Sequence, residues 1–110
     1  MATMKEQLRE ALVRLGSSAK EQEAYLRQLG TAPSADELAL EFSDALGVLQ
    51  GQLDEPAFAA ASRLDRYLED MSGSEHARLW TTDALYAAPE WTHVRQLAEE
   101  ALRFLGKGSE

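Results

Sequence analysis

Residues 34–53 read SADELALEFSDALGVLQGQL, and this stretch decides the fold class. Its apolar side chains recur every three or four positions, a spacing that places them on one side of an α-helix. Ser34 followed by Glu37 is a capping-box pattern, which is typical of a helix start. The helix predicted for 35–53 has one apolar stripe, formed by Leu38, Phe42, Ala45, Leu46, Leu49 and Leu53.

The rest of the chain divides into further helices, because Gly, Pro and Ser fall at regular intervals between apolar-periodic segments. Helices are expected at about 4–15, 18–29, 54–71 and 89–105, with a short one near 82–86. Together they predict an all-α fold: a compact bundle of five to six helices with the 35–53 helix (helix 3) central. We expect a single helical domain over 1–105 and a frayed C-terminal tail at 106–110.

The chain is acidic, with 19 Asp and Glu against 11 Lys and Arg and a formal net charge of −8. Such a surface repels nucleic acid and anionic membranes, so neither is an expected partner, and it attracts basic proteins. The chain has no cysteine, no signal-peptide pattern at its start and no apolar run long enough for a bilayer. These features favour a cytoplasmic protein, and the lack of Ile and Asn suggests a GC-rich bacterial source.

The strongest functional signal is a strip of carboxylates on the predicted 35–53 helix. No Lys or Arg occurs between Arg27 and Arg63. Glu37, Glu41 and Asp44 follow each other at i, i+4 and i+7, so they share one outward side, where like charges repel. The strip is either a docking face for a basic partner or a solvated face neutralised by arginines of other helices, such as Arg14 or Arg66.

A second set of residues on this helix, Leu40, Gly47 and Gly51, projects away from the apolar stripe. Glycine inside a helix costs about 1 kcal/mol relative to alanine, so two of them one turn apart suggest close packing. The packing element is either another helix of the same chain or a partner, including a second copy of this protein. Leu40, Gly47 and Gly51 therefore join Glu37, Glu41 and Asp44 as candidate partner-binding residues.

Three aromatic residues, Trp80, Tyr86 and Trp91, surround the irregular region near Pro89. Exposed aromatics of this kind anchor interfaces, but in small helical domains they more often pin a loop onto the core, which is the interpretation we favour.

Features of catalysis and metal binding are sparse. Glu90 and His93 form one Glu-x-x-His pair, whereas a ferritin-like di-iron site needs two such pairs and two further glutamates. Neither a nucleophile motif nor a glycine-rich phosphate loop occurs. We therefore expect no catalytic residues, no metal site and no cofactor, and we do not expect an enzyme.

Two stretches, 34–42 (SADELALEF) and 79–91 with its Leu79-Trp80-Thr81 and Pro89-Glu90-Trp91 ends, resemble a family of small uncharacterised helical proteins from GC-rich bacteria. The resemblance implies a small helical fold and assigns no site residues. In size and acidity the chain is also similar to nuclease-immunity proteins, although the aromatic and acidic signature of their binding helices is missing.

The function expected from the sequence is a non-catalytic, acidic protein-interaction module, in its sharpest form an immunity-like or antitoxin-like inhibitor of a basic protein. The alternatives are a self-associating structural or accessory protein that forms a homodimer and, less favoured, a metal-dependent or other enzyme.

Overall fold

The computed structural model describes residues 3–29, 35–49 and 51–108, and every regular element in these ranges is a helix. The α-helices are α1 (Met4–Gly16), α2 (Ala19–Gln28), α3 (Asp36–Val48), α4 (Glu55–Asp70), α5 (Thr82–Ala87) and α6 (Pro89–Gly108). A 3-10 helix, η1 (Ser74–Trp80), lies between α4 and α5 and is interrupted at His76. The all-α prediction is confirmed. The described ranges hold seven helices instead of five or six, because 74–80 coils into a 3-10 helix of its own.

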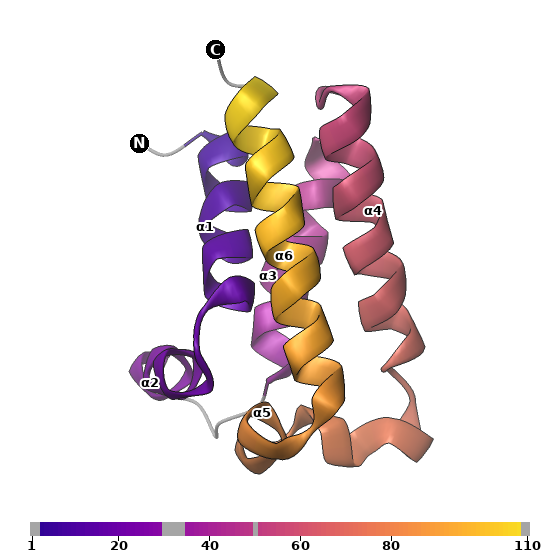
Figure 1. Cartoon of the computed structure of the whole chain (residues 1–110). Helices are drawn as coiled ribbons and strands as arrows, with labels where there is room; N and C mark the ends of the chain where they lie inside the picture. Colours follow the sequence, from indigo (N-terminus) through magenta and orange to yellow (C-terminus); the bar gives the residue numbers. More distant parts are fainter. Residues whose placement is uncertain (1–2, 30–34, 50, 109–110) are drawn as a thin grey trace.

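The four long helices α1, α3, α4 and α6 stand side by side as a bundle, and α2, η1 and α5 lie across one of its ends (Figure 1). The start of α1 and the end of α6 lie together at the opposite end (Figure 1). Around the bundle, α6 packs extensively on both α1 and α4, and α1 packs on α3. The contact between α3 and α4 is much smaller, so the ring of helices is least closed along that seam.

The predicted central position of the 35–53 helix is wrong, because α6 has the most extensive packing and lies between α1 and α4 (Figure 1). An apolar stripe shows which side of a helix is buried, but it does not show how many neighbours that side meets. The predicted helix is also too long at its C-terminal end: α3 ends at Val48, and the backbone has left the helical region at Leu49.

The predicted apolar stripes form the core. Phe42 and Trp91 are its largest fully buried side chains, and the predicted stripe of the 35–53 helix is buried with them, except at Leu53, together with leucines of α1, α4 and α6. Leu53 and Leu102 are only partly buried, and Leu29 is exposed. Burying a large apolar side chain contributes about 1.5–3 kcal/mol, so this shared core holds the long helices together.

Helix starts follow the sequence signals closely. Ser18 and Glu21 form a capping box: the Glu21 N–H donates to Ser18 Oγ at 3.2 Å, and the Ser18 N–H donates to Glu21 Oε1 at 3.3 Å. Thr81 caps α5, and α6 begins at Pro89 as predicted. Ser34, the expected cap of α3, lies outside the described residues. α6 continues to Gly108, beyond its predicted end near Leu105.

A buried polar cluster that the sequence does not single out joins α1, α2, α5 and α6 near the end that α2 covers, with Arg95 also donating to Leu85 O of α5. The Gln22 side-chain amide donates to the carbonyl oxygens of Arg14 and Leu15 at 3.0 and 3.1 Å, and these carbonyls belong to the last turn of α1. Its oxygen accepts from Arg95 Nη2 at 2.9 Å, and Arg95 Nε donates to Ser17 O at 3.0 Å. Burial lowers the pKa of the Arg95 guanidinium. The spacing of Gln22 from Leu26 already places it on the buried side of α2.

Candidate protein-binding surface

The six residues that the sequence singled out lie along or just after α3, and they divide between two sides of it. Glu41 and Asp44 line a hollow between α3 and α1. Leu40 and Gly47 line depressions between α3 and the α4–η1 region. Glu37 is partly buried, and Gly51 lies beyond the helix in a turn.

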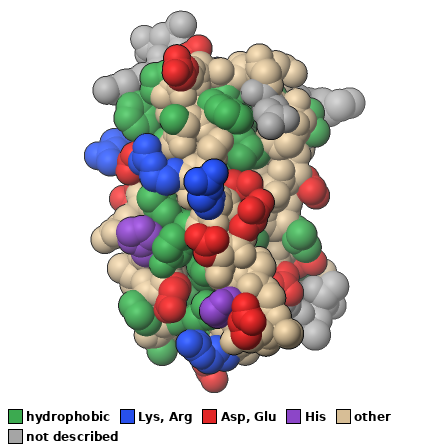
Figure 2. All heavy atoms as spheres, turned by 90° about the vertical axis from the view of Figure 1, so that its right-hand side faces the viewer, with side chains coloured by type: hydrophobic (Ala, Val, Ile, Leu, Met, Phe, Trp, Pro, Cys, Tyr) green, Lys and Arg blue, Asp and Glu red, His purple; other side chains and the backbone are tan. Residues whose placement is uncertain are grey.

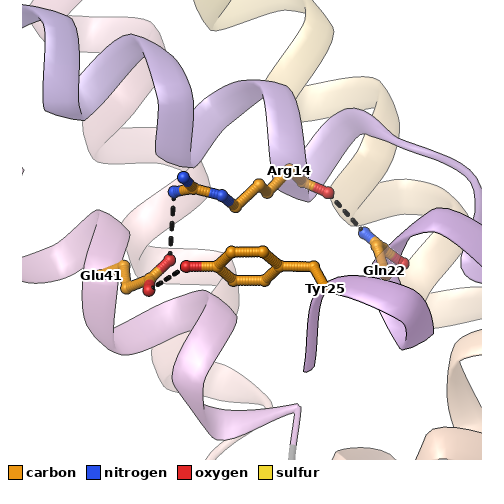
Figure 3. A network of polar contacts seen from close by, with 4 residues as sticks. All are labelled: Arg14, Gln22, Tyr25 and Glu41. Atoms are coloured by element: carbon orange, nitrogen blue, oxygen red, sulfur yellow. Dashed lines mark hydrogen bonds and ion pairs between the residues drawn. The ribbon is translucent and has the colours of Figure 1, made fainter. Parts of the chain in front are cut away.

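Glu41 is held by two residues from other helices (Figure 3). The Tyr25 hydroxyl of α2 donates to Glu41 Oε2 at 2.5 Å, and Arg14 Nη1 of α1 donates to Glu41 Oε1 at 3.3 Å. The Arg14 guanidinium also lies over the Tyr25 ring, 4.3 Å from its centroid, in a cation–π arrangement. The three side chains therefore form one closed unit that ties α1, α2 and α3 together.

The pKa of Tyr25 reflects its position in this unit. Burial, followed by the hydrogen bond to Glu41, raises the pKa of the Tyr25 phenol from 10.0 to about 12. The Arg14–Glu41 ion pair is partly exposed, with side-chain exposures of 32% and 30%, so its own contribution is about 1 kcal/mol or less. Arg14 therefore neutralises the Glu41 carboxylate within the molecule. It is one of the two arginines, with Arg66, that the sequence offers as counter-charges for the strip.

The hollow between α1 and α3 has a volume of about 330 Å³ and is lined by Gln7, Glu10, Arg14, Tyr25, Glu41, Asp44 and Ala45. It contains three carboxylates and one guanidinium, and that guanidinium is already paired with Glu41. In the described part of the chain, no ion pair involves Glu10, Glu37 or Asp44. The hollow consequently retains an excess of negative charge.

Charges of opposite sign are mixed on another side of the molecule (Figure 2). Figure 2 shows the α4 side of the molecule, where Lys and Arg side chains lie among Asp and Glu. Arg63 of α4, for example, pairs with Glu100 of α6. α3 differs because its segment Asp36–Val48 contains four carboxylates and no basic residue.

Two depressions follow the seam between α3 and α4. A groove of about 520 Å³ lies at the η1 end and is lined by Asp36, Ala39, Leu40, Ser72, Gly73, Ala77 and Trp80. A smaller hollow of about 180 Å³ lies farther along and is lined by Ser43, Leu46, Gly47, Phe58, Ser62 and Asp65. No basic side chain occurs among these lining residues.

The glycines of this region correct one expectation. A Cβ atom added at Gly47 or Gly51 would meet no described atom within 4 Å, apart from the immediate chain neighbours and the local helix backbone. The predicted close packing of another helix of the same chain against Gly47 and Gly51 is therefore wrong for the described residues. Gly47 lies at the least closed seam, and Gly51 lies outside the helix.

The aromatic residues Trp80, Tyr86 and Trp91 differ in how deeply they are buried. Trp91 is fully buried, and its indole N–H donates to Leu79 O at 2.6 Å. Trp80 is partly buried and packs edge-on against Trp91, with ring centroids 5.5 Å apart. Tyr86 is 57% exposed, and its hydroxyl donates to Glu23 at 2.8 Å. The core interpretation thus holds for Trp91, holds partly for Trp80 and is wrong for Tyr86.

The single Glu-x-x-His pair is unremarkable in its surroundings. His93 is exposed and packs against the Tyr67 ring at a centroid distance of 4.6 Å. Among the described residues, no group of three His, Cys, Asp or Glu is placed to hold a metal ion.

The chain matches no protein-family model, no curated protein and no solved structure. In the described part of the chain, no helix combines the length and apolar character needed to cross a membrane.

Proposed function

We propose that this chain is a non-catalytic binding protein whose partner presents a basic surface or segment to the outer side of α3. An inhibitor of a basic toxin, in the manner of immunity proteins and antitoxins, is the sharpest form of this proposal. The single observation that carries it is the hollow between α1 and α3, where three carboxylates face one guanidinium that is already paired.

A Lys or Arg side chain of a partner would find a complementary site there. Asp44 is exposed, Glu10 is exposed, and neither takes part in an ion pair within the described residues. Complementary charge of this kind accelerates association and favours one class of partner over others. The net charge of −8 adds a long-range attraction for a basic protein.

The Tyr25–Glu41–Arg14 unit supports the same proposal through preorganisation. Its two hydrogen bonds and the ring contact fix one wall of the hollow before any partner arrives. A wall that is already ordered loses little conformational entropy on binding, so more of the interaction energy remains as affinity. Glu41 would then act by positioning its neighbours, whereas Glu10 and Asp44 would contact the partner.

The proposal is tested with a fluorescein-labelled oligoarginine peptide and fluorescence anisotropy. We expect Glu10→Lys with Asp44→Lys to weaken peptide binding by about tenfold or more. The matched control is Asp70→Lys with Glu99→Lys, which changes the net charge equally at two exposed positions away from the hollow. Circular dichroism verifies that both variants are folded.

The control should weaken binding much less than the hollow variant, and the difference should shrink at high salt. Equal weakening by the two variants would mean that only the total charge matters, and the hollow would not be a binding site. Capture experiments with the native source then identify the partner as a basic protein retained by the wild type and lost by the hollow variant.

A second candidate function is self-association, which the exposed apolar residues of α3 favour. Leu40 and Val48 are 53% and 57% exposed, and Gly47 leaves open space between helices. In this case Leu40, Gly47 and Gly51 would lie at a two-fold interface. Sedimentation velocity over a wide concentration range tests it, and a monomer at every concentration contradicts it.

A further inference from the structure

We infer that the seam between α3 and α4 is the docking site for an amphipathic, cationic helix of the partner. This inference rests on the proposed function, because it specifies the chemistry and shape of the segment that a basic partner would present. The seam consists of the groove at Leu40 and Trp80 and the hollow at Gly47 and Phe58.

The walls of the seam offer apolar surface at the place where the bundle is least closed. Leu40 is 53% exposed, and it lines the groove together with Ala39, Ala77 and the partly buried Trp80. In the smaller hollow, Leu46 and the partly buried Phe58 supply apolar surface, and Gly47 leaves space. Apolar side chains of a partner would gain burial in both depressions.

The groove is built on fixed supports. The Trp80 indole N–H donates to Met71 O at 2.9 Å, which attaches η1 to the end of α4. The Trp80 carbonyl accepts from the Ala35 N–H at 3.1 Å, which attaches η1 to the start of α3. Edge-on packing on the buried Trp91 holds the ring itself. One tryptophan therefore sets the spacing of both walls before a ligand enters.

The acidic residues that line the seam favour a cationic helix over other amphipathic helices. Asp36 lines the groove and Asp65 lines the hollow, and neither depression is lined by a basic residue. The C-terminal end of α4, which carries partial negative charge, adjoins the groove at Ser72 and Gly73. A second copy of this chain would bring the same acidic residues against them, whereas a helix with lysines or arginines beside its apolar stripe would complement them.

The positions of the two depressions set the pattern of the docked helix. Leu40 and Gly47 are seven residues apart on α3, which is about 10 Å along the helix axis. A partner helix lying parallel to the seam would place apolar residues at i and i+7, with further ones at i+3 or i+4. Asp44 is one turn from Leu40, so the basic flank of the same helix could reach the α1–α3 hollow.

The inference is tested with two lysine–leucine peptides of about 18 residues and identical composition, one with leucines at i, i+3, i+4 and i+7 and one scrambled. The wild-type protein should bind the patterned peptide about tenfold more tightly than the scrambled one. Leu40→Ser should remove that advantage without changing the affinity for the scrambled peptide. Val48→Ser is the matched control, because Val48 is equally exposed on α3 and lines neither depression.

A second variant, Gly47→Phe, fills the smaller hollow at a position with open space, and it should also remove the advantage of the patterned peptide. If Leu40→Ser and Val48→Ser have equal effects, the seam is not a specific site and the inference is overturned. If Leu40→Ser instead abolishes self-association, the occupant is a second copy, which also overturns it. If Glu10→Lys with Asp44→Lys weakens both peptides while the seam variants change nothing, the basic-partner function stands and the seam assignment falls.

Discussion

At the scale of single residues, Glu41 differs from Glu37 and Asp44 because, within the described residues, its two oxygens are bonded to side chains of two other helices. The sequence placed Glu37, Glu41 and Asp44 in one strip, since their spacing is helical. It could not separate Glu41 from the others, because Tyr25 and Arg14 are 16 and 27 positions away in the chain. Only the packing of three helices brings these groups together.

Tyr25→Phe should destabilise the protein by about 1 kcal/mol, because it removes a hydrogen bond to a carboxylate in a partly exposed site. Urea unfolding followed by circular dichroism measures the change. Tyr86→Phe is the control: its hydroxyl donates to Glu23 on the open surface, and its loss should be smaller. Equal losses of stability in the two variants would show that the Tyr25–Glu41 hydrogen bond contributes no more to the free energy of unfolding than the Tyr86–Glu23 bond.

Tyr25 also gives the stability a defined pH dependence. Its pKa is about 12 in the folded protein against an ordinary value of 10.0, so folding favours the protonated phenol. This contribution is fully present below the unfolded pKa of 10.0 and is lost as the pH rises towards about 12. Between about pH 8 and about pH 11, the wild type should therefore lose more stability than Tyr25→Phe in urea unfolding.

At the scale of the element, α3 shows which structural features helix periodicity predicts and which it does not. The buried positions Leu38, Phe42 and Leu46 follow directly from the apolar spacing. The predicted end of the helix near Leu53 is wrong, because Leu53 continues the same apolar spacing although the chain turns after Val48. The prediction that another helix of the same chain packs on Gly47 is wrong for the described residues, since a glycine in a helix can face either a close neighbour or open space.

Gly47→Ala should stabilise the protein by about 0.5–1 kcal/mol, because alanine favours the helix and its Cβ meets no described atom within 4 Å apart from the local backbone. Gly73→Ala should destabilise it by about 1 kcal/mol, since Gly73 has φ +108°, a conformation that residues with a Cβ rarely adopt. Thermal and urea unfolding measure both changes. A destabilising Gly47→Ala would mean that something packs at this position after all.

At the scale of the whole molecule, the ring of long helices is unevenly closed. α6 packs on α1 and α4, whereas α3 packs mainly on α1 and only slightly on α4. The sequence indicated an all-helical bundle because every long segment has one apolar side. It could not rank the helix pairs, since residues at the same heptad-like spacing fit several neighbours equally well. The sequence therefore predicts Leu40 and Gly47 as candidate binding residues but does not show that they lie along a loosely packed seam between α3 and α4.

The uneven closure predicts uneven local stability. Amide hydrogens of α3 should exchange with solvent faster than those in the middle of α6, because opening α3 breaks fewer tertiary contacts. Hydrogen exchange followed by mass spectrometry measures this difference. Simultaneous exchange of α3 and α6 would instead indicate a single cooperative unit in which the loose seam has no energetic consequence.

The start of α1 and the end of α6 emerge from the end of the bundle opposite to η1 and α5 (Figure 1). A tether, dye or fusion partner joined at either terminus would consequently project away from Trp80 and the mouth of the groove. The molecule can thus be displayed on a sensor chip through whichever end is convenient, with the η1 end of the groove directed outward (Figure 1).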